Sequence, residues 1–239
     1  MKDVKKIVLY GGGGGAIDIA KYIVDQNNCP NTDFTCEITD VIDDKKSRHS
    51  DLVEITGSSI NTHQSTQTVE EISEKYFLVT VGSSPARNEI YESLKNEGLR
   101  FHTVIHPSAD VSPKAKIGDG SIISPFVLLG AFSSIGENVY INIRATVGHD
   151  SVIGESSIVS PHVAVCGEVS SGKGVYYGAG VVVNRGLIVG DFTKLSSGAV
   201  VAENVKGGSL VYGNPSKYVN MFNRKTGKSR FSRESAPDT

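Results

Sequence analysis

The sequence predicts an α/β Rossmann-like domain at the N-terminus followed by an all-β parallel β-helix. Three observations carry this prediction. Through the second half of the chain an aliphatic residue recurs every six positions. A glycine or asparagine follows it in most repeats. In the first half, short buried-strand patterns alternate with helical ones, and a run of glycines follows the first strand pattern.

The six-residue repeat continues from Val111 to Val205 without an insertion. Strands have a side-chain period of 2 and helices one of 3.6, so neither explains a strict six. A short strand plus a tight corner does, with Gly and Asn at the corner because they tolerate positive φ. Three repeats make one triangular coil, giving a solenoid of about five coils. A β-sandwich with accidental spacing is the alternative.

The aliphatic positions are Val111, Ile117, Ile123, Leu129, Ile135, Ile141, Val147, Ile153, Val159, Val165, Val183, Val189, Leu195 and Val201, with departures at Ser171 and Tyr177.

Composition excludes several classes of protein. The net charge of −2 creates no global field for nucleic acid or a membrane surface. The sequence has no apolar run of about 18 residues that could span a bilayer, and its first residues do not resemble a signal peptide. The three cysteines lack metal-ligand spacing. We therefore expect a cytoplasmic protein with no metal and no nucleic-acid or membrane partner.

The first strand pattern, Lys5 to Tyr10, leads into five consecutive glycines and a helical pattern. Gly11, Gly13 and Ala16 match the G-x-G-x-x-A dinucleotide fingerprint. Glycines let the backbone approach a phosphate, and the helix N-terminus offers free N–H groups to it. A plain tight turn is the alternative, because a glycine run matches such patterns easily.

A second strand is expected from Cys36 to Ile42, ending in Asp43 and Asp44. Acidic residues at this place contact the sugar or base of a nucleotide in such folds. A solvated turn is the alternative interpretation. Residues 45–67 are polar and poorly periodic, and we expect a loop with a short hairpin around Gly57.

Further elements are expected as a helix over Val69–Tyr76, a strand over Phe77–Val81, a helix over Ala86–Asn96 and a strand over Phe101–Ile105. Gly82 and Ser83 lie at the C-terminal end of the third strand, where open parallel sheets bind ligands. The resulting α/β unit is too short for a full dinucleotide-binding domain. Its length favours a domain that binds a nucleotide sugar. The polar tail is predicted to be solvated, with phosphate contacts by its basic residues as the alternative.

One pair inside the repeat is a candidate for catalysis. His149 and Asp150 follow Val147-Gly148 and so lie at a corner. Acyl transfer needs a base that works near neutral pH, which suits histidine. Asp150 can support the imidazole only if the corner turns its side chain back, because adjacent strand residues point to opposite faces. An exposed corner pair without function is the alternative.

The other histidines give weaker signals. His162 lies in a coil, and His106 lies at the domain junction. His49, His63 and His102 lack supporting context, and we expect them at the surface.

Residues 4–217 resemble a family of hexapeptide-repeat enzymes, the sugar acetyltransferases of the bacillosamine and sialic-acid type. The matching features are the glycine turn, Ile42-Asp43-Asp44, Val81-Gly82-Ser83 with Arg87, His106-Pro107-Ser108-Ala109, the stretch from Val147 to Glu155, and Gly213-Asn214-Pro215. The resemblance implies a left-handed β-helix, although parallel crossovers are usually right-handed. It divides the chain into a βαβ nucleotide-sugar domain (1–105), the β-helix (106–217) and a polar tail (218–239).

The resemblance also implies the roles of individual residues. His149 would be the general base and Asp150 its support. Acetyl-CoA would lie between neighbouring subunits of a homotrimer. The residues implied for acetyl-CoA are Gly167, Ser197 and Gly198, and those for the nucleotide sugar are Gly11, Gly13, Asp43, Asp44, Gly82, Ser83 and Arg87. The chain departs from many members at Gly15 and from some at Ile158, where they carry histidine.

The resulting prediction is an acetyl-CoA-dependent N-acetyltransferase acting on a UDP-, dTDP- or GDP-linked 3-amino or 4-amino deoxysugar. Its product would serve surface-glycan and lipopolysaccharide biosynthesis. An O-acetyltransferase acting on a sialic-acid-like sugar is one alternative. A non-catalytic solenoid that binds sugars is the other.

Overall fold

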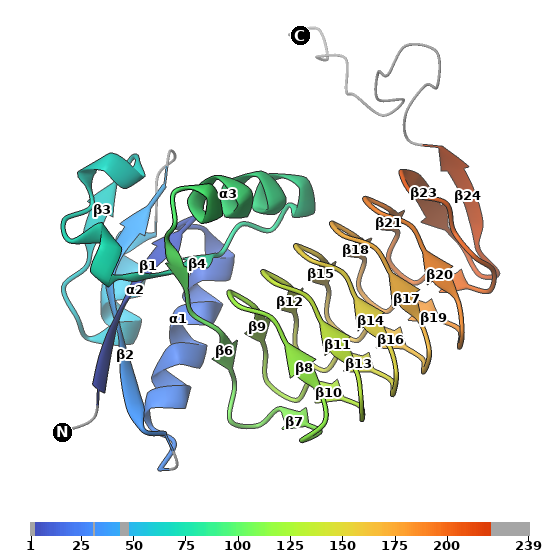
Figure 1. Cartoon of the computed structure of the whole chain (residues 1–239), viewed down its shortest axis with the longest axis horizontal. Helices are drawn as coiled ribbons and strands as arrows, with labels where there is room; N and C mark the ends of the chain where they lie inside the picture. Colours follow the sequence, from blue (N-terminus) through green and yellow to red (C-terminus); the bar gives the residue numbers. More distant parts are fainter. Residues whose placement is uncertain (1–2, 31, 44–47, 221–239) are drawn as a thin grey trace, which may run out of the picture.

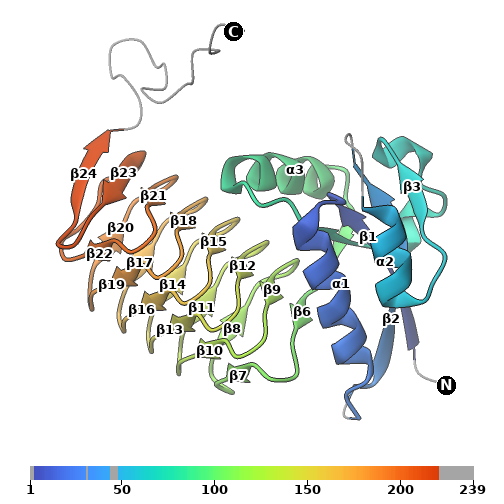
Figure 2. The same cartoon turned by 180° about the vertical axis from the view of Figure 1, so that it is seen from behind.

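The computed structural model describes residues 3–30, 32–43 and 48–220. Figures 1 and 2 show a small α/β domain beside an elongated stack of coils, with α3 lying along the first coils. The fold therefore has the two predicted parts, an α/β domain followed by a left-handed parallel β-helix.

The N-terminal domain is a five-stranded parallel sheet in the order β3-β2-β1-β4-β5. Helices α1 and α2 cover one face, and α3 covers the other. Its elements are β1 (Asp3–Tyr10), α1 (Gly14–Asn27), β2 (Phe34–Ile42), α2 (His49–Thr56), β3 (Asn61–His63), 3-10 turns at Thr66–Thr68 and Ile72–Glu74, β4 (Tyr76–Val79), α3 (Ser84–Asn96) and β5 (Arg100–Phe101).

Three predictions for this domain are wrong. Gly57 ends α2 in the left-handed conformation, with φ of 67°. This glycine therefore marks the C-terminus of a helix and not the turn of a hairpin. The helix expected over Val69–Tyr76 is a 3-10 turn followed by β4. The strand expected over Phe101–Ile105 is split, because β6 (Val104–Ile105) pairs with β9 (Ile122–Ile123) of the coils and not with the α/β sheet.

The β-helix consists of three sheets, whose coil strands β6 to β22 are two residues long and pair in parallel, and the last pair, β23 and β24, is antiparallel. In the coils the second residue of each strand points inward, and most of these side chains are buried in one continuous core. The strands after β6 are β7 (Asp110–Val111), β8 (Lys116–Ile117), β9 (Ile122–Ile123), β10 (Leu128–Leu129), β11 (Ser134–Ile135), β12 (Tyr140–Ile141), β13 (Thr146–Val147), β14 (Val152–Ile153), β15 (Ile158–Val159), β16 (Ala164–Val165), β17 (Ser170–Ser171), β18 (Tyr176–Tyr177), β19 (Val182–Val183), β20 (Ile188–Val189), β21 (Lys194–Leu195), β22 (Val200–Val201), β23 (Ser209–Tyr212) and β24 (Lys217–Asn220).

The repeat glycines have a different physical cause from the predicted one. Gly118 and Gly148 do not adopt positive φ. A Cβ atom on either would lie 2.5 Å from a backbone nitrogen of the next coil, so the stacking distance requires glycine there. Positive φ occurs two residues later, for example at Gly120 and at Asp150, which has φ of 57°.

The two departures from the aliphatic repeat lie close together. Tyr177 is fully buried, and burial raises the pKa of its phenol, an effect that the nearby Ser171 hydroxyl partly opposes. A large and a small side chain therefore fill the space that two aliphatic residues fill elsewhere.

A buried polar cluster of Asp40, His63 and Lys75 links the residue that precedes β4 to strand β2 of the sheet. Asp40 on β2 is almost fully buried and accepts hydrogen bonds from Lys75 at 2.5 Å and His63 at 2.9 Å. Burial by itself would raise the pKa of Asp40, but hydrogen bonds from Lys75, Thr39, His63 and Asn61 outweigh it and hold the pKa below its ordinary 3.8. The carboxylate therefore stabilises the fold above that ordinary pKa, and this stabilisation is lost as the pH falls through the lowered value.

We predict that Asp40→Asn lowers the free energy of unfolding by about 3 kcal/mol at pH 7, because it leaves the buried Lys75 ammonium unpaired. Urea unfolding at pH 7 and at lower pH measures this, and the difference from wild type should shrink below about pH 4. Glu71→Gln, which removes the exposed pair with Lys6, is the control and should cost less than about 1 kcal/mol. Equal losses in the two variants would contradict the assignment.

Candidate functional site

The glycine turn and Asp43 meet at the carboxyl ends of β1 and β2. Gly11 has φ of 111°, which favours glycine, and Gly13 is the N-cap of α1. The carboxylate of Asp43 accepts a hydrogen bond from the N–H of Gly12 at 2.6 Å. One amide that a phosphate could use is therefore already bonded to a carboxylate. Asp44 lies outside the described residues.

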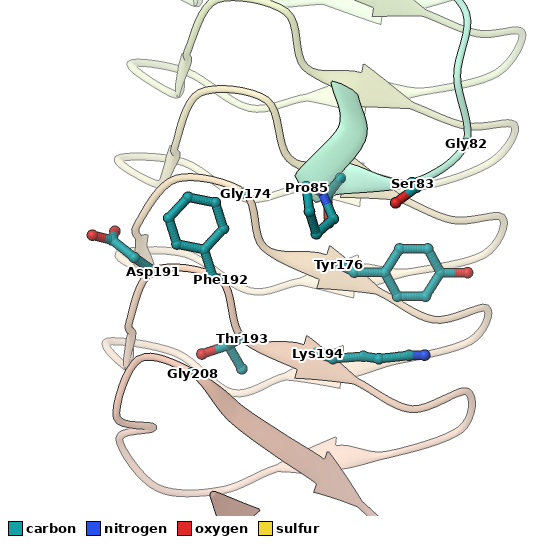
Figure 3. Close-up of a pocket in the computed structure, with 11 residues that line it drawn as sticks. Gly82, Ser83, Pro85, Gly174, Tyr176, Asp191, Phe192, Thr193, Lys194 and Gly208 are labelled. Carbon is teal, nitrogen blue, oxygen red and sulfur yellow. The ribbon is translucent and has the colours of Figure 1, made fainter. Parts of the chain in front are cut away.

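Gly82 and Ser83 lie at the carboxyl end of β4, and Ser83 is the N-cap of α3. Both are exposed, and they line a cavity of about 710 Å³ between the start of α3 and the coils. Figure 3 shows Tyr176 and Lys194 of the coils on the opposite side of this cavity. Neither coil residue was predicted from the sequence. The signal available was an aromatic and a charged residue at outward-facing strand positions.

Arg87, expected near the nucleotide sugar, is fully buried between α3 and the coils. It donates hydrogen bonds to the backbone oxygens of Val79 and of Asn138, the latter at 2.7 Å. Burial lowers its pKa to about 9, which still leaves it charged at neutral pH. Through these two bonds Arg87 joins the two domains, and its contact with substrate stays a prediction.

The corner after β13 brings His149 and Asp150 together. The left-handed backbone of Asp150 turns its side chain back, and its Oδ2 lies 2.8 Å from His149 Nδ1. A carboxylate at Nδ1 favours the tautomer with the proton on that atom and leaves the Nε2 lone pair available. Both side chains are about half exposed. The geometry required for a supported base is therefore present.

Gly167 lies directly beneath the imidazole, one coil further on. A Cβ atom on Gly167 would be 2.6 Å from His149 Nε2, so only glycine allows this ring position. The N–H of Gly167 donates no hydrogen bond to other residues within the described ranges. Close by, Glu168 and Arg185 form an exposed ion pair, and their hydrogen bond holds the pKa of Glu168 below its usual value.

Ser197 and Gly198 do not join this group within one chain. They form the exposed corner between β21 and β22, whereas His149 lies at the corner between β13 and β14. The cavity beside Gly82 lies near a third corner, that of Phe192 between β20 and β21. The predicted site residues are thus distributed over different corners of the coils.

The prediction that His63 and His102 are surface residues is wrong. His63 bonds Asp40, and His102 lies in the core with its Nε2 3.2 Å from Cys36 Sγ. Burial lowers the pKa of His102 to about 4 and raises that of Cys36 to about 11, so both are neutral at pH 7. The sequence carries no signal for such contacts, because each joins residues far apart in the chain.

The remaining histidines have separate roles. His49 is half-buried, which also contradicts its predicted surface position, and its Nε2 lies 2.6 Å from the backbone oxygen of Ile60. His106 ties the domains together through Asp25 at 3.2 Å. His162 is exposed at a corner away from His149.

No cluster of three or more metal-ligating side chains occurs within residues 3–30, 32–43 and 48–220. Over the same ranges, no helix is long and apolar enough to cross a membrane.

In its β-helix, its preceding α/β domain and its supported histidine at a coil corner, the chain is similar to the hexapeptide-repeat acyltransferases that act on sugars. No protein-family model matches the chain. One curated relative, GDP-perosamine N-acetyltransferase of Escherichia coli O157:H7, is 37% identical over 76 residues. That match spans 32% of this chain and about a third of the relative (34%).

Solved structures extend the similarity to 90% of the chain. The acetyltransferase domain of PglB from Neisseria gonorrhoeae FA1090 has a TM-score of 0.79 at 26% identity and is covered completely. A histidine-to-asparagine mutant of the perosamine N-acetyltransferase of Caulobacter crescentus, solved with CoA and GDP-perosamine, has a TM-score of 0.78 at 26% identity and is covered to 96%. These findings confirm the resemblance to the sugar acetyltransferases with hexapeptide repeats.

We predict that Gly167→Ala displaces the His149 imidazole while leaving the coil stable, because the added methyl meets a side chain that can move. Gly148→Ala is the matched comparison, because its methyl would meet backbone 2.5 Å away and force the coils apart. The midpoint temperature of thermal unfolding should be lower than that of wild type in Gly148→Ala and unchanged in Gly167→Ala. The imidazole NMR signal of His149 should shift in Gly167→Ala, and an unchanged signal would contradict the contact.

Proposed function

We propose that this chain is an acetyl-CoA-dependent N-acetyltransferase that acts on a nucleotide-linked amino sugar. The observation that carries the proposal is the His149–Asp150 pair, with Nε2 directed over the backbone of Gly167. The likeness to enzymes solved with CoA and GDP-perosamine supports this choice of co-substrate and acceptor. We further propose that the enzyme works in the cytoplasm and serves the synthesis of surface glycans, including lipopolysaccharide.

In the proposed reaction, His149 Nε2 takes a proton from the sugar amine as the nitrogen attacks the thioester carbonyl. Asp150 stabilises the imidazolium that forms. The free N–H of Gly167 would donate to the oxygen that becomes negative. Ile158, where some family members carry histidine, is buried and has no donor, so backbone amides carry this role.

Residues 1–105 would hold the nucleotide sugar at Gly11, Gly13, Asp43 and the Gly82–Ser83 loop, and residues 106–217 would hold acetyl-CoA. Asp44 is included by its place next to Asp43. Within one chain His149 lies on a different corner from the cavity at Gly82. We therefore propose a homotrimer in which base and acceptor come from neighbouring chains, with Gly167 and Ser197–Gly198 facing one CoA groove.

An uncovered apolar face supports this assembly. On the sheet with the strand order β22-β19-β16-β13-β10-β7, the outward residues are Val200, Val182, Ala164, Thr146, Leu128 and Asp110, of which the first three and Leu128 are apolar. Leu128 is 42% exposed, and Phe126 and Phe132 at its two flanking corners are more exposed still. A sheet face on which apolar side chains predominate, flanked by two exposed phenylalanines, fits a protein interface.

We predict that His149→Ala lowers kcat by about 10²–10⁴, the usual contribution of a general base. The measurement is free-thiol release from acetyl-CoA with UDP-, dTDP- and GDP-linked amino sugars as acceptors. Asp150→Asn should retain binding and lose part of the rate. An unchanged kcat in His149→Ala would remove His149 from the mechanism.

We also predict that wild type sediments at three times its 25.4 kDa chain mass and that Leu128→Lys dissociates it. The same variant should lose turnover, because the site needs a neighbouring chain. Val152→Lys, at an exposed apolar position on a different sheet, is the control and should remain trimeric. Full activity in a monomeric variant would contradict the shared site.

A further inference from the structure

The corner that carries His149 is repeated in the next two coils, and the three corners stack. The N–H of Glu168 donates to the backbone oxygen of His149 at 2.9 Å. One coil further on, the N–H of Gly186 donates to the oxygen of Gly167 at 3.1 Å. The corner residues therefore form two columns along one edge of the solenoid. The first column is His149, Gly167 and Arg185, and the second is Asp150, Glu168 and Gly186.

The second column places two carboxylates on neighbouring coils. Asp150 and Glu168 both have a left-handed backbone, with φ of 57° and 62°. Neighbouring coils are separated by about 4.8 Å, the usual spacing of paired strands. The side chain of Asp150 turns back to the histidine that precedes it. Glu168 is preceded by Gly167, which offers no side chain to pair with, so its carboxylate needs a partner from another coil.

Arg185 supplies that partner from the following coil. Its Nε donates to one carboxylate oxygen of Glu168 at 3.2 Å, and its Nη2 donates to the other oxygen. A two-point contact of this kind fixes the orientation of both groups. Arg185 belongs to the same column as the His149 imidazole, two coils away, or about 10 Å. The ion pair therefore lies directly beside the His149–Asp150 pair.

The two pairs influence each other through their charges. The pKa of Glu168 lies below its ordinary value mainly because Arg185 donates to it, and a charged His149 lowers it further. The Asp150 carboxylate opposes this effect. The pKa of Arg185 is raised, chiefly by its hydrogen bond to Glu168 and in smaller part by Asp150. Such coupling is reciprocal, so both members of the ion pair act in turn on the imidazole.

Few other groups can contribute charge at this edge in the part of the chain that the structure describes. On the preceding coil the two corner residues are Ala131 and Phe132, which are uncharged. Cys166, which precedes Gly167, is the other titratable residue at these corners. The edge thus holds one imidazole, two carboxylates, one guanidinium and one thiol.

We propose that the Glu168–Arg185 ion pair is a positioning device that sets the protonation state of His149. The assignment rests on the proposed function. A general base must be without its proton before it can take one from the sugar amine. Glu168 is a second carboxylate near the imidazole and by itself would favour the charged imidazolium. The guanidinium of Arg185 offsets this carboxylate, and so keeps His149 available as a base near neutral pH.

The test is an NMR titration of the His149 imidazole in the full chain, with the pH profile of kcat/KM measured alongside. Arg185→Gln leaves two carboxylates without the offset and should move the titration midpoint to higher pH. Glu168→Gln leaves the guanidinium unpaired and should move the midpoint to lower pH. For exposed charges about 5–10 Å away, each shift should be about 0.3–0.6 pH unit. The acid limb of the kinetic profile should move in the same direction.

Further variants separate charge from packing. Arg185→Lys keeps the positive charge, and the double variant Arg185→Gln/Glu168→Gln keeps the net charge, so both should titrate close to wild type. The shifts of the single variants should shrink in 1 M salt, where charges more than about 3 Å apart are screened. Lys6→Gln, which removes a cation from an exposed ion pair in the α/β domain, is the matched control and should not move the midpoint.

All variants are compared in the same assembly, checked by sedimentation, so that charges from a neighbouring chain contribute equally. Shifts of the same sign in both single variants, or no shift in either, would overturn the assignment and leave the proposed function in place. An unmoved midpoint with a higher KM for acetyl-CoA in Arg185→Gln would also overturn it, because Arg185 would then contact the co-substrate. The titration needs no substrate. If wild type acetylates no nucleotide amino sugar, the proposed function falls, and the titration still decides the electrostatic contact.

Discussion

The close stacking of the coils is the constraint on which the rest of the structure depends. Backbone hydrogen bonds join each coil to the next, for example from Gly148 N–H to the oxygen of Val165 at 2.8 Å. At this spacing a side chain at Gly118, Gly130 or Gly148 would meet the next backbone. The repeat is therefore strict because every coil sets the space available to its neighbour.

This constraint leaves two kinds of position free to carry chemistry. Corner residues such as His149 point away from the core. The left-handed backbone at the corner turns the side chain of Asp150 back toward the His149 imidazole. Outward strand residues such as Tyr176 and Lys194 also lie outside the packed interior. A rigid stack can thus hold corner side chains and outward strand side chains at fixed separation, while their identity varies at little cost to stability.

The α/β domain adds a second set of constraints at the place where it meets the coils. Buried outward residues of the first coils, among them Ile122 and Tyr140, share one core with helix α1. The buried guanidinium of Arg87 bonds to a backbone oxygen in each part. These contacts fix where α3 begins relative to the coils, and hence the width of the cavity beneath Ser83.

The sequence by itself determined the solenoid, because a period of six leaves few alternatives, and it singled out His149 and Asp150 as a corner pair. It also located Gly11, Asp43 and Gly82 at strand ends, since these follow directly from local strand and turn patterns. Tertiary structure decided the rest. The cavity joins Ser83 to Lys194, and the Asp40 cluster joins β2 to Lys75, across long stretches of chain. Such contacts leave no periodic trace, because each depends on how separate elements pack and not on the residues between them.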